Sequence, residues 1–178
     1  MPVELNNDQE LSSYLRDKIR MFGVRPGLEF PDVTPLLMDP EAFQIAIDAL
    51  KRRYEDKQIT HVVSCESRGF IFGAPLALAL KVPFVLVRRA QLLPGKTVGV
   101  DYTSGFYTGR MEMHEDAMTK GARVVIIDDT VATGNTLKVT GELIEKLEGE
   151  VIECGCIVDM ISRKQTLHKI PIFGLVTL

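Results

Sequence analysis

Two adjacent carboxylates, Asp128 and Asp129, follow an apolar run and precede a short segment of small and hydroxylated residues. The stretch VVIIDDTVATGNTLKVTGELI, residues 124–144, begins with a pattern typical of a buried strand and ends with one typical of a helix. Ligands of open α/β sheets bind outside the carboxyl ends of the strands. The acidic pair is therefore expected at a ligand-binding edge of a sheet.

The segment after the acidic pair indicates a phosphate-binding turn. Backbone N–H groups of such a turn and the N-terminus of the following helix attract a phosphate dianion, and Gly134 permits close backbone approach. The candidate phosphate-binding residues are Thr130, Ala132, Thr133, Gly134, Asn135 and Thr136. Carboxylates beside a phosphate site fit a ligand that also carries hydroxyls, as a ribose 5-phosphate does. The alternative is a structural turn with a helix cap, but the complete order of strand, acidic pair, turn and helix favours the ligand site.

The elements that position these residues alternate along the chain. We expect helices at residues 8–23, 40–54, 70–80 and 136–147, and strands at residues 61–65, 82–87, 106–113, 123–128, 150–161 and 171–178. Residues 91–105, rich in glycine, threonine and serine, are expected to form a loop. Near-continuous apolar strands separated by helices predict an α/β fold with a doubly wound, mainly parallel sheet.

Composition excludes several classes of protein. The 178 residues suit about one domain, and 46% hydrophobic with 25% charged residues is an ordinary globular balance. A net charge of −3 predicts no nucleic-acid partner, and no apolar run is long enough to predict a membrane span. The three cysteines lack metal-site spacing, and the N-terminal residues do not resemble a signal peptide. We therefore expect a cytoplasmic protein without direct metal ligands.

The segment around the acidic pair resembles the phosphoribosyl-pyrophosphate (PRPP) motif of type I phosphoribosyltransferases. Other segments are similar to the adenine phosphoribosyltransferase branch of that family, and ESRGFIFG followed by LPGKT is specific to the branch. The segments lie at residues 25–40, 66–80, 82–97 and 150–161. The resemblance runs in order from about residue 20 to the C-terminus.

The resemblance implies one phosphoribosyltransferase domain, residues 1–178. It would consist of a small N-terminal hood, approximately residues 1–38, over a Rossmann-like core, approximately residues 39–178. The implied reaction belongs to purine salvage: PRPP and adenine give AMP and pyrophosphate. The implied cofactor is Mg²⁺, carried by PRPP and not ligated by the protein, and the implied assembly is a homodimer.

The resemblance also assigns roles to individual residues. Phe30 would pack on the adenine ring, with backbone groups of Glu29 and Pro31 at the adenine edge. Ser67 and Arg68 match the pyrophosphate-binding turn, and a planar guanidinium group suits a leaving pyrophosphate. Arg88 and Arg89 match a basic pair that is presented across the dimer interface. The catalytic set is Arg68, Asp128 and Asp129.

The chain departs from the family pattern in and near the predicted loop. Gly105 stands where the family has a glutamate that handles a purine proton, and Asp101 is the nearest loop carboxylate. Leu92 replaces a lysine, and Thr130 replaces a leucine that contacts the base. Two alternatives therefore stay open: a weak or inactive paralogue that binds PRPP or AMP, and a phosphoribosyltransferase for a different purine.

Overall fold

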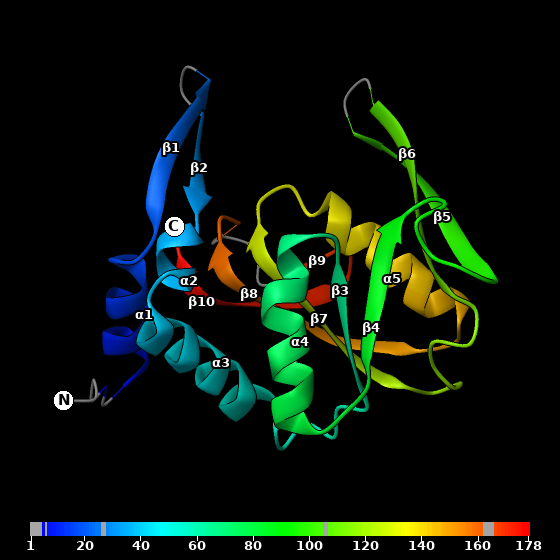
Figure 1. The fold of residues 1–178 in the computed structure, drawn as a ribbon, viewed down its shortest axis with the longest axis horizontal. Helices are drawn as coiled ribbons and strands as arrows, with labels where there is room; N and C mark the ends of the chain where they lie inside the picture. The colour runs from blue at the N-terminus through cyan, green and yellow to red at the C-terminus, as the bar shows by residue number, and fades with distance from the viewer. Residues whose placement is uncertain (1–4, 6, 26–27, 105–106, 162–165) are drawn as a thin grey trace.

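The structure is a computed structural model that describes residues 5, 7–25, 28–104, 107–161 and 166–178. Its centre is an eight-stranded sheet with strand order β5-β6-β4-β3-β7-β8-β10-β9 (Figure 1). The strands that lie parallel to one another are β3 (His61–Cys65), β4 (Phe84–Arg89), β7 (Arg123–Val131), β8 (Glu150–Asp159) and β10 (Ile170–Thr177). The predicted mainly parallel α/β sheet is therefore confirmed.

Helices cover both faces of this sheet. Successive strand residues point to opposite sides, so a strand that is apolar throughout has a surface to bury on each face. On β7, Val125 and Ile127 belong to one apolar cluster, and Val124 and Ile126 belong to the other. The first cluster includes residues of α3 (Pro40–Tyr54) and α4 (Arg68–Leu80), and the second includes residues of α5 (Asn135–Lys146). This arrangement confirms the doubly wound fold.

The N-terminal segment differs from its predicted helix. Helix α1 spans Asp8–Arg16 and is followed by a hairpin of β1 (Arg20–Arg25) and β2 (Leu28–Asp32), then by α2 (Thr34–Leu37). The expected helix extended through Phe22, but Phe22 instead lies opposite Phe30 in the hairpin. Pairing with β2 supplies the backbone hydrogen-bond partners, and this tertiary contact overrides the helix-like spacing. Figure 1 shows the hairpin projecting beyond the sheet on the side of α1.

The expected loop at residues 91–105 is wrong over much of its length. Strand β5 (Thr97–Ser104) pairs antiparallel with β6 (Tyr107–His114), and β6 also pairs antiparallel with β4. Glycine, threonine and serine in this segment suit an exposed two-stranded ribbon, which projects on the side of the molecule opposite the β1–β2 hairpin (Figure 1).

Two further features complete the described chain. Strand β9 (Thr166–Leu167), which sequence periodicity did not predict, is only two residues long and pairs with the start of β10. Within the described residues, no helix has the length and apolar character that crossing a membrane requires.

Candidate active site

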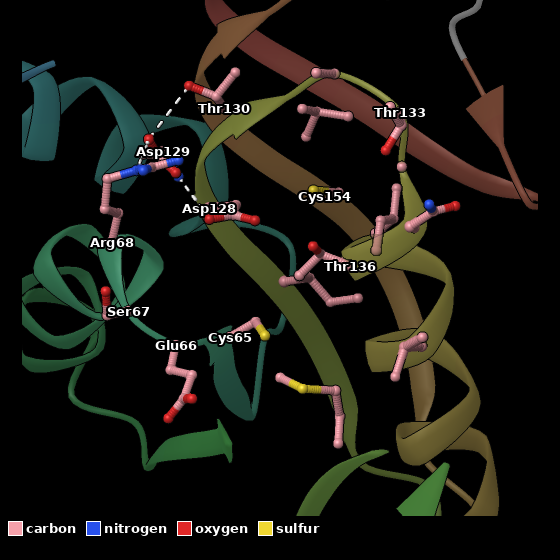
Figure 2. A pocket seen from close by; sticks show the side chains of 18 of the residues that line it. Cys65, Glu66, Ser67, Arg68, Asp128, Asp129, Thr130, Thr133, Thr136 and Cys154 are labelled. Carbon is pink, nitrogen blue, oxygen red and sulfur yellow. Dashed lines mark hydrogen bonds and ion pairs between the residues drawn. The ribbon is translucent and has the colours of Figure 1, made fainter. Parts of the chain in front are cut away.

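A cavity of about 580 Å³ opens at the carboxyl end of β7, between the segments that follow β3 and β7 (Figure 2). Side chains from β2, the turn after β3, β4, β5 and the segment after β7 contribute to its wall. The predicted site residues that line it are Phe30, Ser67, Arg68, Arg89, Asp128, Asp129, Thr130, Ala132, Thr133, Gly134, Asn135 and Thr136. Residues from four distant parts of the sequence therefore meet at one edge of the sheet.

Three predicted residues are not part of the cavity wall. Glu29 is exposed on β2, and Pro31 is buried on the same strand. Arg88 lies at the end of β4, where its Nε donates to Glu66 Oε2 at 2.9 Å and its Nη1 donates to the Leu92 carbonyl at 3.2 Å. In this structure Arg89, and not Arg88, is the member of the basic pair that reaches the cavity of its own chain.

Both members of the acidic pair line the cavity, and they have different partners. Asp129 is buried, and its Oδ2 accepts hydrogen bonds from Arg68 Nε at 2.6 Å and from Thr130 Oγ1 at 3.3 Å (Figure 2). Asp128 Oδ1 accepts the backbone N–H of Asp129 at 2.9 Å. Burial, and secondarily the neighbouring Asp129 charge, raises the pKa of Asp128 well above the ordinary carboxyl range. At neutral pH the free site therefore favours the protonated form of Asp128, and a ligand that brings a cation or hydrogen-bond donors would favour its carboxylate form.

The raised pKa of Asp128 makes stability depend on pH. Between the unfolded-state pKa, about 4, and the higher folded-state pKa, the folded protein binds the additional proton. The free energy of unfolding contributed by Asp128 is therefore expected to fall as the pH rises through this window. Urea unfolding of the wild type and of Asp128→Asn, compared at several pH values, checks this. A difference between the two proteins that is constant with pH would contradict it.

Glycine at position 69 allows α4 to start directly against the acidic pair. A Cβ atom there would lie 2.9 Å from the Ile127 carbonyl oxygen and 3.1 Å from Asp128 Oδ1. The first turn of α4 is thus held against the end of β7, with the positive end of the helix dipole near the carboxylates. This packing joins the turn that carries Arg68 to the strand that carries the acidic pair.

The segment after β7 curves away from the acidic pair and enters α5 (Figure 2). Gly134 precedes the helix with φ +76°, a left-handed conformation that favours glycine. On its other side the backbone is covered by β9, since a Cβ at Gly134 would lie 1.8 Å from Leu167 Cδ2. The turn therefore has its backbone on the cavity wall and a packed apolar side chain behind it.

Arg68, directly after the turn between β3 and α4, brings this part of the core into contact with the β1–β2 hairpin. The peptide bond between Glu66 and Ser67 is cis. The guanidinium carbon of Arg68 lies 5.8 Å from the centroid of the Phe30 ring, within the range of a cation–π contact. Arg68 thus contacts both the aromatic side chain of the hairpin and the acidic pair of the core.

Glu66 is a site residue that sequence reasoning did not assign. Its side chain is 7% exposed, and its Oε1 accepts a hydrogen bond from Arg89 Nε at 2.6 Å. Burial alone would raise the pKa of this carboxyl, but hydrogen bonds from Arg89 and Arg88 outweigh burial and lower it. The sequence signals were its place directly after a predicted strand and its position as the first residue of the ESRGFIFG segment.

Other cavity residues were also missed because they look like core residues. Tyr102 and Met111 contribute from the β5–β6 ribbon, and Cys65 and Cys154 contribute from β3 and β8. Burial raises the pKa of the Cys65 thiol to about 12, so this thiol is unreactive at neutral pH. All three cysteines are free and buried, as expected for small apolar residues.

Of the positions where the chain departs from the family pattern, Thr130 lines the cavity, whereas Asp101 and Leu92 do not. Asp101 forms an ion pair with Arg110 at 3.0 Å and does not line the cavity. Leu92 is half-exposed after β4. Gly105 lies outside the described residues.

Comparison with known proteins places this geometry in a family. The family model for the phosphoribosyl transferase domain matches residues 32–176. Adenine phosphoribosyltransferase 1 of Triticum aestivum is 42% identical over 154 residues, which cover 85% of each chain. The crystal structure of adenine phosphoribosyltransferase from Rhodothermus marinus superimposes with a TM-score of 0.86 at 37% identity, covering 96% of this chain and 99% of that one. The structure of the Saccharomyces cerevisiae enzyme, complexed with an imino-altritol bisphosphate and adenine, superimposes with a TM-score of 0.87 at 33% identity. The match covers 94% of this chain and 99% of the yeast chain.

Proposed function

Because this chain belongs to the phosphoribosyl transferase family, we propose that it acts in purine salvage, transferring the 5-phosphoribosyl group of PRPP to adenine to give AMP and pyrophosphate. The observation that carries this proposal is the single cavity shared by Arg68, the acidic pair and the turn at residues 130–136. The cavity combines a phosphate site, hydroxyl acceptors and a guanidinium group, which are the groups that PRPP requires.

Two neighbouring groups position the ribose phosphate: the acidic pair near the end of β7, and the turn that leads into α5. Backbone N–H groups of residues 132–136 and the N-terminus of α5 bind the 5-phosphate. Asp128 and Asp129 accept hydrogen bonds from the ribose hydroxyls, which fixes the anomeric carbon in one orientation. These contacts also stabilise the positive charge that develops on the sugar when the bond to pyrophosphate breaks.

Arg68 changes partners when substrate binds. Its Nε is bonded to Asp129 in this structure, and its side chain is 57% exposed, so it is free to turn toward an incoming pyrophosphate. That movement leaves Asp129 available to a ribose hydroxyl. The guanidinium group then stabilises the negative charge that develops on the leaving group.

The residues present fit Mg²⁺ that arrives with PRPP. Among the described residues, no cluster of three or more histidine, cysteine or acidic side chains is placed to hold a metal ion. Burial and the neighbouring Asp129 charge raise the pKa of Asp128, and a cation bound beside it would lower that pKa. When bound with pyrophosphate, Mg²⁺ neutralises charge on the leaving group. Asp128 and Asp129 are the residues that would contact the hydrated ion.

The hood supplies the base site. Phe30 lies on β2 at the cavity wall and offers an aromatic face for the adenine ring. The hood, approximately residues 1–38, acts with the core, approximately residues 39–178, as one domain. Leu11 and Leu15 of α1 support this, since they belong to the same apolar cluster as α3 and α4.

The first test is a product assay with several bases. Purified protein is mixed with PRPP and Mg²⁺ and, separately, with adenine, hypoxanthine, guanine, uracil and orotate. AMP and pyrophosphate in equal amounts with adenine, and no nucleotide with the other bases, is the expected result. Nucleotide from another base alone, or none from any base, would contradict the proposal.

We also propose that the protein is a homodimer, assembled through α4 and β4. Ile71 and Leu78 lie two turns apart on one side of α4 and are exposed, and Leu86 is exposed on β4. Leu86 alternates with the buried Val85 and Val87, so it faces the same side of the sheet as α4. Exposed apolar side chains grouped in this way are typical of a protein interface.

Leu78→Lys is expected to convert the dimer to a monomer, because it places a charge on this apolar surface at its most exposed side chain. Analytical ultracentrifugation measures the change. Met38→Lys is the matched control, since Met38 is similarly exposed but lies on the hood. A Leu78→Lys protein that sediments as a dimer, or equal effects of both substitutions, would rule out this interface.

The cytoplasm is the proposed location. The cysteines Cys65, Cys154 and Cys156 are all free, which suits a reducing compartment.

A further inference from the structure

Glu66 connects the pyrophosphate-binding turn to the two arginines at the end of β4. We propose that Glu66 is a positioning residue for the pyrophosphate group of PRPP, because it holds Arg89 at the cavity and Arg88 against the start of the β4–β5 connection. The inference rests on the proposed function, and it adds a role for a side chain that itself bears the wrong charge to bind pyrophosphate.

The Glu66 side chain is more deeply buried than the two arginine side chains that it contacts. The Glu66 side chain is 7% exposed, whereas that of Arg89 is 66% exposed. The backbone N–H of Glu66 also donates to the Val87 carbonyl at 3.0 Å, so the backbone that carries this side chain is held against β4. A long exposed side chain loses rotamer freedom when it binds an anion. Glu66 restricts Arg89 before the ligand arrives, which lowers that cost.

The contact geometry selects an orientation for each guanidinium group. Both arginines donate through Nε, at 2.9 Å from Arg88 and at 2.6 Å from Arg89. Arg88 also donates through Nη1 to the Leu92 carbonyl, so it clamps the start of the β4–β5 connection. Arg89 is held by Nε beside the cavity that it lines. The Glu66 carboxylate thus holds Arg88 at the β4–β5 connection and Arg89 at the cavity.

Charge balance gives Glu66 a second effect on the pair. Arg88 and Arg89 are neighbours in sequence, and two guanidinium groups held close together repel each other. The carboxylate between them offsets that repulsion. Without it, repulsion between the two guanidinium groups is expected to shift Arg89 from the orientation that it has at the cavity.

The direction in which pyrophosphate affinity changes, when the Glu66 charge is removed, distinguishes a positioning role from a purely electrostatic one. Removing a negative charge beside the cavity would, by Coulomb's law alone, strengthen the binding of pyrophosphate. Loss of positioning would weaken it. AMP has no pyrophosphate group, so its affinity reports on the phosphate and base sites but not on Arg89.

The test measures the dissociation constants of Mg²⁺-pyrophosphate and of AMP for wild type and Glu66→Gln by calorimetry. We expect Glu66→Gln to weaken pyrophosphate binding about tenfold and to leave AMP affinity within about twofold. The KM for PRPP is expected to rise with little change in the KM for adenine. Glu66→Asp, which keeps the charge on a shorter side chain, is expected to recover part of the loss.

Glu153→Gln is the matched control. Glu153 is also buried and accepts from two cations, Arg53 at 2.7 Å and Lys57 at 3.2 Å, but it lies near the start of β8 and does not line the cavity. Both substitutions are expected to lower thermal stability, and only Glu66→Gln is expected to change pyrophosphate affinity. Unchanged or tighter pyrophosphate binding in Glu66→Gln, or equal losses for pyrophosphate and AMP, would overturn the inference. A wild-type protein that binds pyrophosphate but forms no AMP would instead count against the proposed function.

Discussion

Asp128→Asn is expected to lower kcat/KM for PRPP by about 10²- to 10³-fold. Hydrogen bonds to a charged acceptor contribute about 1.5–3 kcal/mol each. The carboxylate also stabilises the positive charge that develops on the ribose, an interaction that is stronger in the transition state than in the ground state. A combined loss of about 3–4 kcal/mol corresponds to the expected factor. Steady-state kinetics with varied PRPP and saturating adenine measures it.

The size of the substituted side chain does not account for this effect. Asparagine is nearly isosteric with aspartate, and the amide oxygen still accepts the N–H of Asp129. Asp159→Asn is the control, because Asp159 is buried at the carboxyl end of the adjacent strand β8 but does not line the cavity. Asp159→Asn is expected to keep kcat/KM within a few-fold of the wild type. Near-normal activity of Asp128→Asn would remove Asp128 from the mechanism.

The sheet order explains why residues distant in sequence act together. Strands β4, β3 and β7 are parallel neighbours, so the segments that follow them emerge at one edge. Glu66 and Arg68 follow β3, Arg89 ends β4, and Asp128 lies near the end of β7. The order in which the strands pair therefore determines which residues meet at the site. The lengths of the helices between those strands do not determine it.

The parts of the site that the sequence predicts are those encoded within one continuous segment. The turn from Thr130 to Thr136 has its strand, acidic pair, glycine and helix in order, so its location at the cavity follows from local pattern. The mainly parallel sheet follows in the same way from apolar runs that alternate with helices.

The parts that the sequence did not predict depend on contacts between segments. Glu66 acquires its partners only because β3 and β4 are paired, and no periodicity shows that pairing. Phe22 has helical spacing in the sequence but a strand conformation, because β2 lies beside it. Strand β5 has the composition of a loop and becomes a strand through pairing with β6.

Gly134→Ala is expected to lower kcat/KM for PRPP by about 100-fold and to weaken AMP binding as well. The new Cβ would lie 1.8 Å from Leu167 Cδ2, so the turn or β9 must move. Displacement of a binding group by about 1 Å is enough for a loss of this size. The 5-phosphate is present in both PRPP and AMP, which is why both ligands are affected, in contrast to substitution of Glu66.

Two further variants separate the steric effect from backbone strain. Gly121→Ala has almost the same starting conformation, φ +77° against +76°, but nothing lies within 4 Å of its new Cβ. It therefore carries the cost of a left-handed alanine, about 1–2 kcal/mol of stability, and is expected to keep full activity. Leu167→Ala in the Gly134→Ala background removes the clashing methyl group and is expected to restore part of the AMP affinity. Equal losses of activity in Gly121→Ala and Gly134→Ala, or no recovery in the double variant, would show that contact between the turn and β9 does not hold the phosphate site in place.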